Sequence, residues 1–344
     1  MTKSKMRIGI LSAGGDCPGI NAAIRGVGKT AIVEYGMDVL GVVNGFQGLI
    51  DKDTIELNEQ LLSGILTLGG TILGTSRLKP FKPALGEDPA EKPELIKKNY
   101  KEMGLDALVC IGGNGTQKTA NLLSKEGLNV VGVPKTIDND IWGTDVTFGF
   151  DTAVYIATDA IDRLHTTANS HKRVMVIEVM GHQAGWIALY SGMAGGGDVI
   201  LVPEIPYDLE KVANCLLERS RKKKPYSIVV VAEGIQKMTK KSAGVFIAKQ
   251  IRKMTGLETR ETILGYIQRG GSPTPSDRIL ATRFGAYAAK LIHEQKFGTM
   301  VALKGGVITS LPLEEVGGKT RLIEPDNTLV LKGRQMGVCF GDQC

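Results

Sequence analysis

Short apolar runs alternate with longer amphipathic stretches along the whole chain. The run MRIGILS at 6–12 is followed by a glycine-rich turn and by a stretch with helical spacing from about Ile20 to Tyr35. Further apolar runs predict strands at 37–43, 107–113, 128–134, 173–179, 198–203, 226–234 and 301–307, with a helix from about Thr116 to Lys125. Nearly continuous apolar strands separated by helices are typical of parallel sheets that helices cover on both faces. The pattern therefore predicts an α/β fold.

Three polar segments follow predicted strands of the first half. They are GGD at 14–16, GGNGT at 112–116 and KTIDND at 135–140. In open α/β sheets, ligands bind beyond the carboxyl ends of the strands. We therefore expect these three segments to face one binding cleft.

Composition narrows the class of protein. A chain of 344 residues is too long for one ordinary core and predicts two lobes, and 42% apolar with 23% charged residues excludes general disorder. The net charge of +6 is modest, and 5% aromatic content argues against a stacking platform for nucleic acid. Five scattered cysteines, no signal peptide and no run of about 18 apolar residues predict a reduced, cytoplasmic protein without a membrane span.

The two glycine-rich turns, GGD at 14–16 and GGNGT at 112–116, have the features of an anion-binding site. Bare amides and the start of a helix attract negative charge, so a strand, a glycine turn and a helix in succession can hold phosphate. The GGD turn lacks the Gly-Lys-Ser/Thr of a P-loop and also the complete dinucleotide fingerprint. The glycines of GGD could instead allow a helix to pack closely on the sheet. The glycines of GGNGT could instead form a tight turn that binds no ligand. Two such turns in one sheet favour phosphate.

The segment PKTIDNDI at 134–141 carries the most chemical information. Asp138 and Asp140 stand two residues apart in a short polar stretch after a buried strand. One carboxylate can accept a proton from a substrate hydroxyl, while the other holds Mg²⁺ against phosphate oxygens. An Asx-turn or a helix cap is the alternative role for these residues.

Basic residues are separated in the second half of the chain. Arg173, Arg260 and Arg269 lie in polar surroundings, where a planar guanidinium can bind two phosphate oxygens together. Taken singly, each arginine also fits a surface charge. Glu233 ends an apolar run and can accept sugar hydroxyls, and the four histidines have no metal-ligand spacing.

These segments belong to a longer, ordered series of motifs. They are GGDCPGINAAIRG, GGTILGTSR, IGGNGT, PKTIDNDIWGTDVTFGFDTA, EVMGHQAGW, VAEG and LGYIQRGGSPTPSDRILATRFG. Up to about Thr309, the chain resembles the phosphofructokinase family. The resemblance implies two doubly wound lobes with largely parallel sheets and an active-site cleft between them. Residues 1–148 and about 267–318 would form a larger lobe that binds the phosphoryl donor. Residues from about 149 to 266, with 319–344, would form a smaller sugar-phosphate lobe.

The resemblance also implies roles for individual residues. Asp138 would take the proton from the 1-hydroxyl of fructose 6-phosphate, assisted by Thr136 and Asp140, with Asp140 near Mg²⁺. The residues implied at the donor site are Gly15, Arg77, Gly113, Gly115, Thr116 and Lys135. Those implied at the substrate site, besides Thr136 and Asp138, are Arg173, Met180, Gly181, Glu233, Arg260, Tyr266 and Arg269. Arg173 and Arg260 resemble arginines that reach a neighbouring subunit's site, which implies a homo-oligomer, a tetramer or a dimer.

Four positions depart from the best-known ATP-using bacterial pattern. Asn114 replaces an Asp that helps to hold Mg²⁺, Tyr266 replaces a sugar-contacting His, His182 replaces an Arg and Lys135 replaces a Gly. Pyrophosphate-using members resemble one another in an Asp at 115 together with a Lys at 135. Gly115 leaves the nucleotide space open while Lys135 is of the pyrophosphate type, so the chain resembles a mixed subgroup. We expect ATP to be the donor, with pyrophosphate as the alternative.

Other functions remain as alternatives. A silent sugar-phosphate sensor or a regulatory subunit is compatible with Asn114 and His182, although a pure binder does not need a base beside the acceptor. A nicotinamide dehydrogenase would need an acidic residue at ribose-binding distance from the first turn in the context of the dinucleotide fingerprint, which the sequence lacks. Other phosphorylated ketoses would present similar groups to the same side chains.

Overall fold

The chain packs into two compact units. The computed structural model describes residues 5–82, 88, 90–235 and 241–343. The larger unit contains Met1–Thr136, Ile141–Asp151 and Arg269–Thr320. The smaller unit contains Ile137–Asp140, Thr152–Gln268 and Arg321–Cys344. Each unit is therefore assembled from segments that are far apart in the sequence.

The larger unit is built on a seven-stranded sheet. Its strand order is β11-β10-β5-β4-β1-β2-β3. The inner neighbours from β10 to β2 run parallel, and the edge strands β3 and β11 run antiparallel to theirs. The strand bounds are β1 (Arg7–Ala13), β2 (Asp38–Val42), β3 (Thr54–Glu56), β4 (Ala107–Gly112), β5 (Val130–Pro134), β10 (Thr299–Lys304) and β11 (Val307–Pro312).

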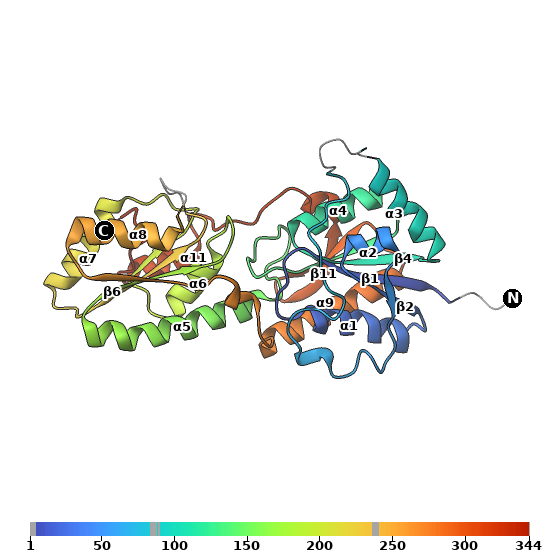
Figure 1. Cartoon of the computed structure of the whole chain (residues 1–344), viewed down its shortest axis with the longest axis horizontal. Helices are drawn as coiled ribbons and strands as arrows, with labels where there is room; N and C mark the ends of the chain where they lie inside the picture. The colour runs from blue at the N-terminus through green and yellow to red at the C-terminus, as the bar shows by residue number, and fades with distance from the viewer. Residues whose placement is uncertain (1–4, 83–87, 89, 236–240, 344) are drawn as a thin grey trace. The chain divides into compact units, whose positions relative to one another are not determined.

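Helices cover both faces of this sheet (Figure 1). One face carries α1 (Ile20–Val33) and α9 (Pro275–His293), and the other carries α2 (Phe46–Asp51), α3 (Glu91–Glu102) and α4 (Asn114–Lys125). The short elements η1 (Ile65–Thr67) and α10 (Leu313–Val316) complete the unit. Every residue of β4 and β5 is buried. This two-sided cover is the reason why these strands read as unbroken apolar runs.

Glycines bring α1 and α9 into backbone contact. A Cβ atom at Gly26 would lie 2.7 Å from the carbonyl oxygen of Thr282, and one at Gly285 would lie 2.4 Å from that of Ala23. Such distances exclude any side chain at either position. Segments from the two ends of the larger unit's sequence are thus packed tightly together.

The smaller unit is built on a four-stranded, fully parallel sheet with the order β7-β8-β6-β9. Its strands are β6 (Val174–Val179), β7 (Val199–Leu201), β8 (Ser227–Ala232) and β9 (Thr259–Ile263). Helices α5 (Phe150–His171) and α6 (Trp186–Ala194) lie on one face, and α7 (Leu209–Arg221) and α8 (Ala243–Thr255) on the other (Figure 1). The remaining elements are η2 (Gly265–Arg269) and α11 (Thr328–Gln335).

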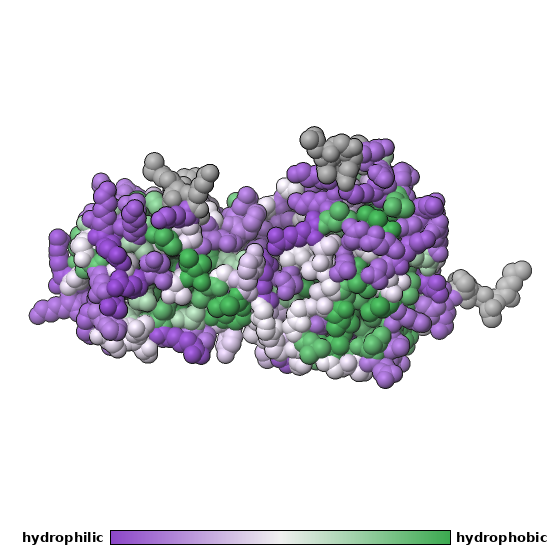
Figure 2. Space-filling view, in the orientation of Figure 1, coloured by the Kyte–Doolittle hydropathy of each residue, from purple (hydrophilic) through white to green (hydrophobic). Residues whose placement is uncertain are grey.

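The predicted fold class is confirmed: both units are α/β with largely parallel sheets. On the surface, polar side chains alternate with patches of apolar ones on each unit (Figure 2). Within the described part of the chain, we find no helix that combines the length and the apolar character of a membrane span.

Candidate active site

The three polar segments of the first half each follow a strand of the larger sheet, and these strands end at the same edge of that sheet. Ala13, the last residue of β1, is in register with Gly112 of β4, and Gly112 is in register with Pro134 of β5. The segments that follow these residues therefore leave the sheet side by side. This is the carboxyl edge, where ligands bind in open parallel sheets.

The turn after β1 is held in place by its neighbours. Gly14 has a φ of +87°, its amide donates to the carbonyl of Ser76 at 2.9 Å, and its own carbonyl accepts from the Thr75 hydroxyl at 2.7 Å. The left-handed conformation at Gly14 is one that glycine adopts without steric cost. The turn is therefore a fixed backbone surface.

Two basic side chains reach this turn. The Lys135 ammonium donates to the carbonyl of Gly15, and Arg269 Nη1 donates to the carbonyl of Asp16 at 3.1 Å. A Cβ atom at Gly15 would lie 2.9 Å from that Arg269 nitrogen, so the arginine packs against the bare glycine. Both cations bring positive charge to the predicted phosphoryl-donor site.

Helix α4 opens directly after β4. Its N-cap residue is Gly113, which supplies no capping side chain, so a ligand can satisfy the first-turn amides. Thr116 is buried, and its hydroxyl donates to the carbonyl of Ala13 at 3.2 Å, which ties α4 to the end of β1. A Cβ atom at Gly115 would meet nothing within 4 Å. Of the predicted donor residues, Gly113, Gly115 and Thr116 are brought together here, while Arg77 is exposed.

The segment after β5 continues the sheet before it turns away. The Lys135 amide donates to the carbonyl of Gly112 at 3.1 Å, and the Thr147 hydroxyl donates to the carbonyl of Thr136 at 2.8 Å. Lys135 is only 2% exposed, and Thr136 and Asp140 are buried as well. Asp138, the predicted base, is half-buried.

The predicted metal site has few protein ligands. Among the residues that the structure describes, no three His, Cys, Asp or Glu side chains gather as a metal cluster. Mg²⁺ is usually held by one or two carboxylates together with substrate phosphates and waters, so it does not require such a cluster. Asp140, the carboxylate predicted to hold Mg²⁺, is buried in the smaller unit.

Three of the predicted sugar-phosphate residues lie at the carboxyl edge of the smaller sheet, where Val179 of β6 is in register with Ala232 of β8. Glu233 Oε1 accepts from the amides of Gly181 at 3.2 Å and of His182 at 2.8 Å.

Beside Glu233, the amide of Met180 donates to Gln268 Oε1 at 2.8 Å. Gln268 lies in η2, the element that also contains the 73% exposed Tyr266. Arg269, the last residue of η2, belongs to the larger unit through its contact with the turn after β1.

Arg173 and Arg260 lie at the opposite, amino edge of the smaller sheet. Arg173 precedes β6, whereas Met180 follows it, so the two are separated along the strand by roughly 20 Å. Arg260 lies near the start of β9, in register with Met175 of β6. Within one chain, the structure does not bring these two arginines to Met180 and Glu233.

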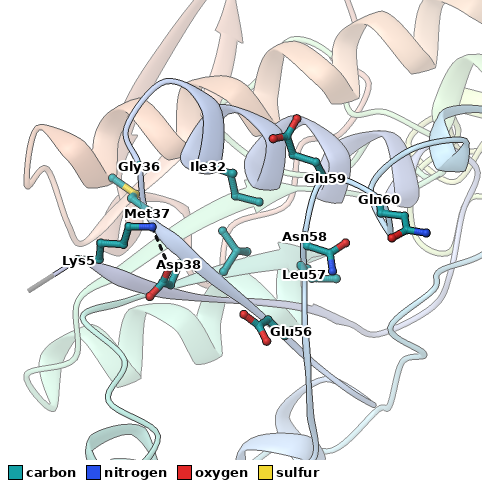
Figure 3. A pocket seen from close by; sticks show the side chains of 11 residues that line it. Lys5, Ile32, Gly36, Met37, Asp38, Glu56, Leu57, Asn58, Glu59 and Gln60 are labelled. Carbon is teal, nitrogen blue, oxygen red and sulfur yellow. Dashed lines mark ion pairs between the residues drawn. The ribbon is translucent and has the colours of Figure 1, made fainter.

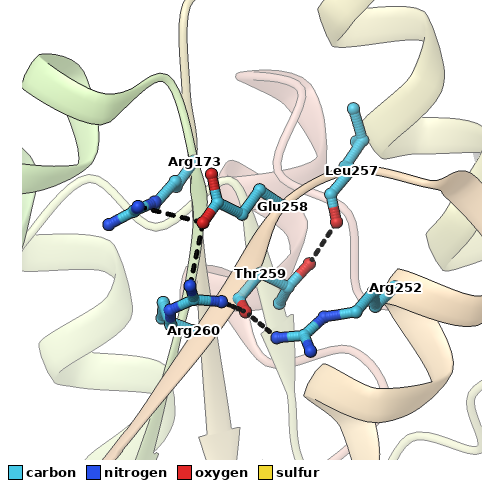
Figure 4. A network of polar contacts seen from close by, with 6 residues as sticks. All are labelled: Arg173, Arg252, Leu257, Glu258, Thr259 and Arg260. Atoms are coloured by element: carbon cyan, nitrogen blue, oxygen red, sulfur yellow. Dashed lines mark hydrogen bonds and ion pairs between the residues drawn. The ribbon is translucent and has the colours of Figure 1, made fainter.

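Glu258 joins the two arginines (Figure 4). Its Oε1 atom is 2.9 Å from Arg173 Nη2 and 2.9 Å from Arg260 Nη2. The hydrogen bond from Arg173, with the charges of both arginines, lowers the pKa of this exposed carboxyl below its ordinary value. Two guanidinium groups that share one carboxylate carry a net positive charge and lie close together.

Cys17, next to the turn after β1, is not a nucleophile. Burial raises the pKa of its thiol to about 12, although the charge of Lys135 acts in the opposite direction. The thiol is therefore protonated at neutral pH, and the thiolate is the reactive form of cysteine.

A cavity of about 400 Å³ lies at the amino edge of the larger sheet (Figure 3). Asp38, at the start of β2, lines it together with Lys5, and their ion pair measures 3.7 Å. None of the predicted site residues lines this cavity. It is separate from the candidate active site.

Comparison with known proteins decides the family. The sequence profile described as "Phosphofructokinase" matches residues 7–292. The chain belongs to the phosphofructokinase family. Within this family, it is 66% identical to the "ATP-dependent 6-phosphofructokinase 3" of Bacteroides thetaiotaomicron, over 98% of this chain and 100% of that protein. It is 56% identical to the "ATP-dependent 6-phosphofructokinase" of Spirochaeta thermophila, over 97% of each.

Solved phosphofructokinase structures have the same fold. A phosphofructokinase from Saccharomyces cerevisiae matches with a TM-score of 0.82 and 30% identity, over 98% of this chain. The chain spans only 47% of that yeast protein. A "Pyrophosphate-dependent phosphofructokinase" from Marinobacter aquaeolei matches with a TM-score of 0.83 over 97% of this chain. At 23% identity, the second comparison shows the shared fold alone.

The sequence did not indicate Arg321, a residue that contacts the loop of the predicted base. Arg321 contacts the backbone of Asn139 and Asp140, although it lies 182 residues after Asn139 in the chain. The sequence after residue 310 contains no motif that singles it out. The signal is a tertiary contact.

Proposed function

We propose that this chain is an ATP-dependent 6-phosphofructokinase. It transfers the γ-phosphoryl group of ATP to the 1-hydroxyl of fructose 6-phosphate, which gives fructose 1,6-bisphosphate, a step of glycolysis. The observation that carries the proposal is the register at the larger sheet's carboxyl edge. In this register β5, which the segment with Asp138 follows in the chain, pairs with β4, and helix α4 begins directly after β4. A base and an anion-binding helix start are the parts that phosphoryl transfer to a hydroxyl requires.

The larger unit would bind the donor. The amides of the first turn of α4 and the dipole of this helix favour the phosphates, and the ammonium of Lys135 adds charge at the adjacent turn. Gly15, Gly113, Thr116 and Arg77 complete the proposed donor site. The open space at Gly115 leaves room for a nucleotide.

Mg²⁺ would accompany the nucleotide. Asp140 is the protein residue proposed to hold it, while Asn114 can offer only a neutral oxygen. When bound, the ion neutralises charge on the phosphate oxygens. The small number of protein carboxylates implies that the phosphates and waters supply most of its ligands.

At the acceptor, Asp138 would take the proton of the 1-hydroxyl, with Thr136 and Asp140 beside it. Placing this base correctly and neutralising the phosphates should supply most of the rate. Met180, Gly181 and Glu233, at the carboxyl edge of the smaller sheet, would bind the sugar phosphate. Tyr266 and Arg269 complete the proposed substrate site.

Arg173 and Arg260 would serve a neighbouring subunit. Their position at the amino edge of the smaller sheet supports this, because within one chain β6 separates them from the other sugar-phosphate residues. Their pairing through Glu258 presents two guanidinium groups together. We therefore propose a homo-oligomer, a dimer or a tetramer, in which these arginines complete the adjoining site.

The choice of donor is tested by initial rates. With fructose 6-phosphate and Mg²⁺, ATP and pyrophosphate are compared at equal concentration. A rate with ATP alone is expected, because Gly115 leaves the nucleotide space open. A rate with pyrophosphate alone would replace the proposal by a pyrophosphate-dependent transferase with Lys135 closing that space. No rate with either donor would favour a sugar-phosphate sensor.

The assignment of the base is tested by Asp138→Ser. Turnover should fall by at least about 100-fold, since a positioned base contributes at least that much. Binding of fructose 6-phosphate, measured by calorimetry, should persist. The matched control is Asp145→Ser, a carboxylate in the larger unit that accepts from the amide of Gly305. Wild-type turnover in the Asp138 variant would remove Asp138 from the mechanism.

A further inference from the structure

Arg321 connects the C-terminal segment to the loop that carries Asp138. Its backbone amide donates to the carbonyl of Asp140 at 2.8 Å. Its side-chain Nη1 donates to the carbonyl of Asn139 at 3.1 Å. One residue thus holds two successive carbonyl groups of the loop, immediately after the proposed base.

Arg321 is itself held by a buried framework in the smaller unit. Its guanidinium lies over the Trp186 ring, 4.0 Å from the ring centre, and its carbonyl accepts from Trp186 Nε1 at 3.0 Å. Trp186 is 4% exposed at the start of α6. Two residues further along, the amide of Ile323 donates to Glu204 Oε1 at 3.1 Å. The same carboxylate accepts from the Gly185 amide, so this framework includes the start of α6.

The loop needs such support. Asn139 has a φ of +54°, a left-handed conformation that Asn adopts more readily than most other non-glycine residues but that is still less favourable than the right-handed one. Asn139 is 2% exposed and Asp140 is 7% exposed, so their carbonyls lie away from solvent and need protein donors. Conformations of this kind persist only where the surroundings impose them.

We propose that Arg321 is a positioning residue for phosphoryl transfer. The guanidinium holds Asn139 in its left-handed conformation and thereby fixes the direction of the Asp138 carboxylate. Arg321 acts through the backbone of the loop. This inference rests on the proposed function, because it takes Asp138 as the base.

Substitution of the side chain should loosen the loop without dismantling it. The backbone hydrogen bond from residue 321 to Asp140 survives any replacement other than proline. The contacts of the guanidinium with Asn139 and Trp186 are lost. A small displacement of a catalytic group lowers turnover sharply, whereas substrate contacts elsewhere persist.

The kinetic test compares Arg321→Met, Arg321→Lys and Lys319→Met. Lys319 is the matched control, because its ammonium lies 5.7 Å from the centre of the Trp142 ring and it precedes Arg321 by two residues. Arg321→Met should lower kcat roughly 10- to 100-fold and change KM for either substrate by less than about twofold. Arg321→Lys should recover part of the turnover, since it keeps the charge beside the indole. Lys319→Met should match the wild type.

A second measurement does not depend on activity. Hydrogen exchange of the peptide that spans 136–141 should be faster in Arg321→Met than in the wild type, with exchange in β6 and β8 unchanged. If the wild type has no kinase activity, the proposed function fails, and this measurement still tests the support of the loop. Unchanged exchange in that peptide would overturn the inference.

Two kinetic outcomes would also overturn it. Wild-type kcat in Arg321→Met would show that the guanidinium does not position the base. A higher KM for the sugar phosphate with an unchanged kcat would make Arg321 a ligand of the substrate. If the Met variant does not fold, Arg321→Lys carries the test: a reduced kcat with faster exchange supports the inference, and wild-type values for both overturn it.

Discussion

At the scale of single residues, Gly115 is the position of the proposed donor site at which a side chain would enter open space. It lies in the first turn of α4, and a Cβ atom there would meet nothing within 4 Å. The fold therefore tolerates a side chain at this position. Gly112, three residues earlier, contrasts with it, because a Cβ atom would lie 2.2 Å from the Thr116 hydroxyl oxygen.

We predict that Gly115→Asp folds normally and loses the use of ATP. Its carboxylate occupies the open space and repels the donor phosphates, which should lower kcat/KM for ATP by about tenfold or more. Steady-state kinetics and the Tm measure the two parts of this prediction. Gly115→Ala is the control and should keep most of the activity. Equal losses in both variants would show that helix geometry, and not the donor space, is affected.

The candidate residues differ in how far their sequence context predicts them. Asp138 and Gly115 stand in long local motifs next to strands, so neighbouring residues are enough to mark them. Arg321 and Glu258 have no such context. Their importance arises from contacts with Asn139 and with Arg173 that only the folded chain creates.

At the scale of elements, Glu204 connects the start of α6 to the C-terminal segment. It accepts from the amides of Gly185 and Ile323. Burial raises the pKa of this carboxyl above its ordinary value of 4.5, although both hydrogen bonds favour the ionised form. Ionisation of Glu204 is therefore less favourable in the folded chain than in the unfolded one.

This shift predicts a pH dependence of stability. Between the unfolded pKa and the raised folded pKa, the folded protein binds more protons, so stability from this group declines as pH rises. Above the folded pKa, the loss of stability caused by ionised Glu204 no longer changes with pH. Glu204→Gln removes the titration, so its Tm should fall less than that of the wild type between about pH 4 and pH 7. The exposed Glu324→Gln is the control, and parallel Tm curves for the Glu204 variant and the wild type would refute the prediction.

The strands that the sequence did not predict share a cause. Strands β3, β9 and β11 lie at the edges of their sheets and contain exposed or half-buried residues, whereas β7, an edge strand that the sequence did predict, is buried throughout. In β9, the residues TRETI include exposed side chains and lack an apolar run. The inner strands were predicted because burial on both faces requires continuous apolar sequence.

At the scale of the whole molecule, the proposed shared site makes subunits interdependent. Asp138→Ser removes the proposed base from one chain, and Arg260→Ser removes a guanidinium proposed to act in a neighbour's site. Each variant alone should be nearly inactive. In a mixed oligomer, one site combines an intact Asp138 with an intact Arg260, so turnover should return to about half of the wild-type value in a dimer.

The experiment uses the two variants co-expressed with different affinity tags and purified through both. The control pairs Asp138→Ser with Arg269→Met. Arg269 contacts the Asp16 turn of its own chain, so no mixed site regains both residues. Recovery in the first mixture alone supports a shared site, whereas no recovery there would place Arg260 outside it.

The discontinuity of the larger unit has a consequence for how the chain is made. Helix α1 packs backbone to backbone on α9, which the ribosome delivers only after residue 274. At about 5–20 residues per second, translation from residue 136 to the start of α9 takes about 7 to 28 seconds. During that interval, the face of α1 that packs on α9 and the edge of β5 that pairs with β10 remain exposed, because α9 and β10 have not yet been synthesised. The nascent chain is therefore most exposed to chaperones and to aggregation while the smaller unit is being synthesised.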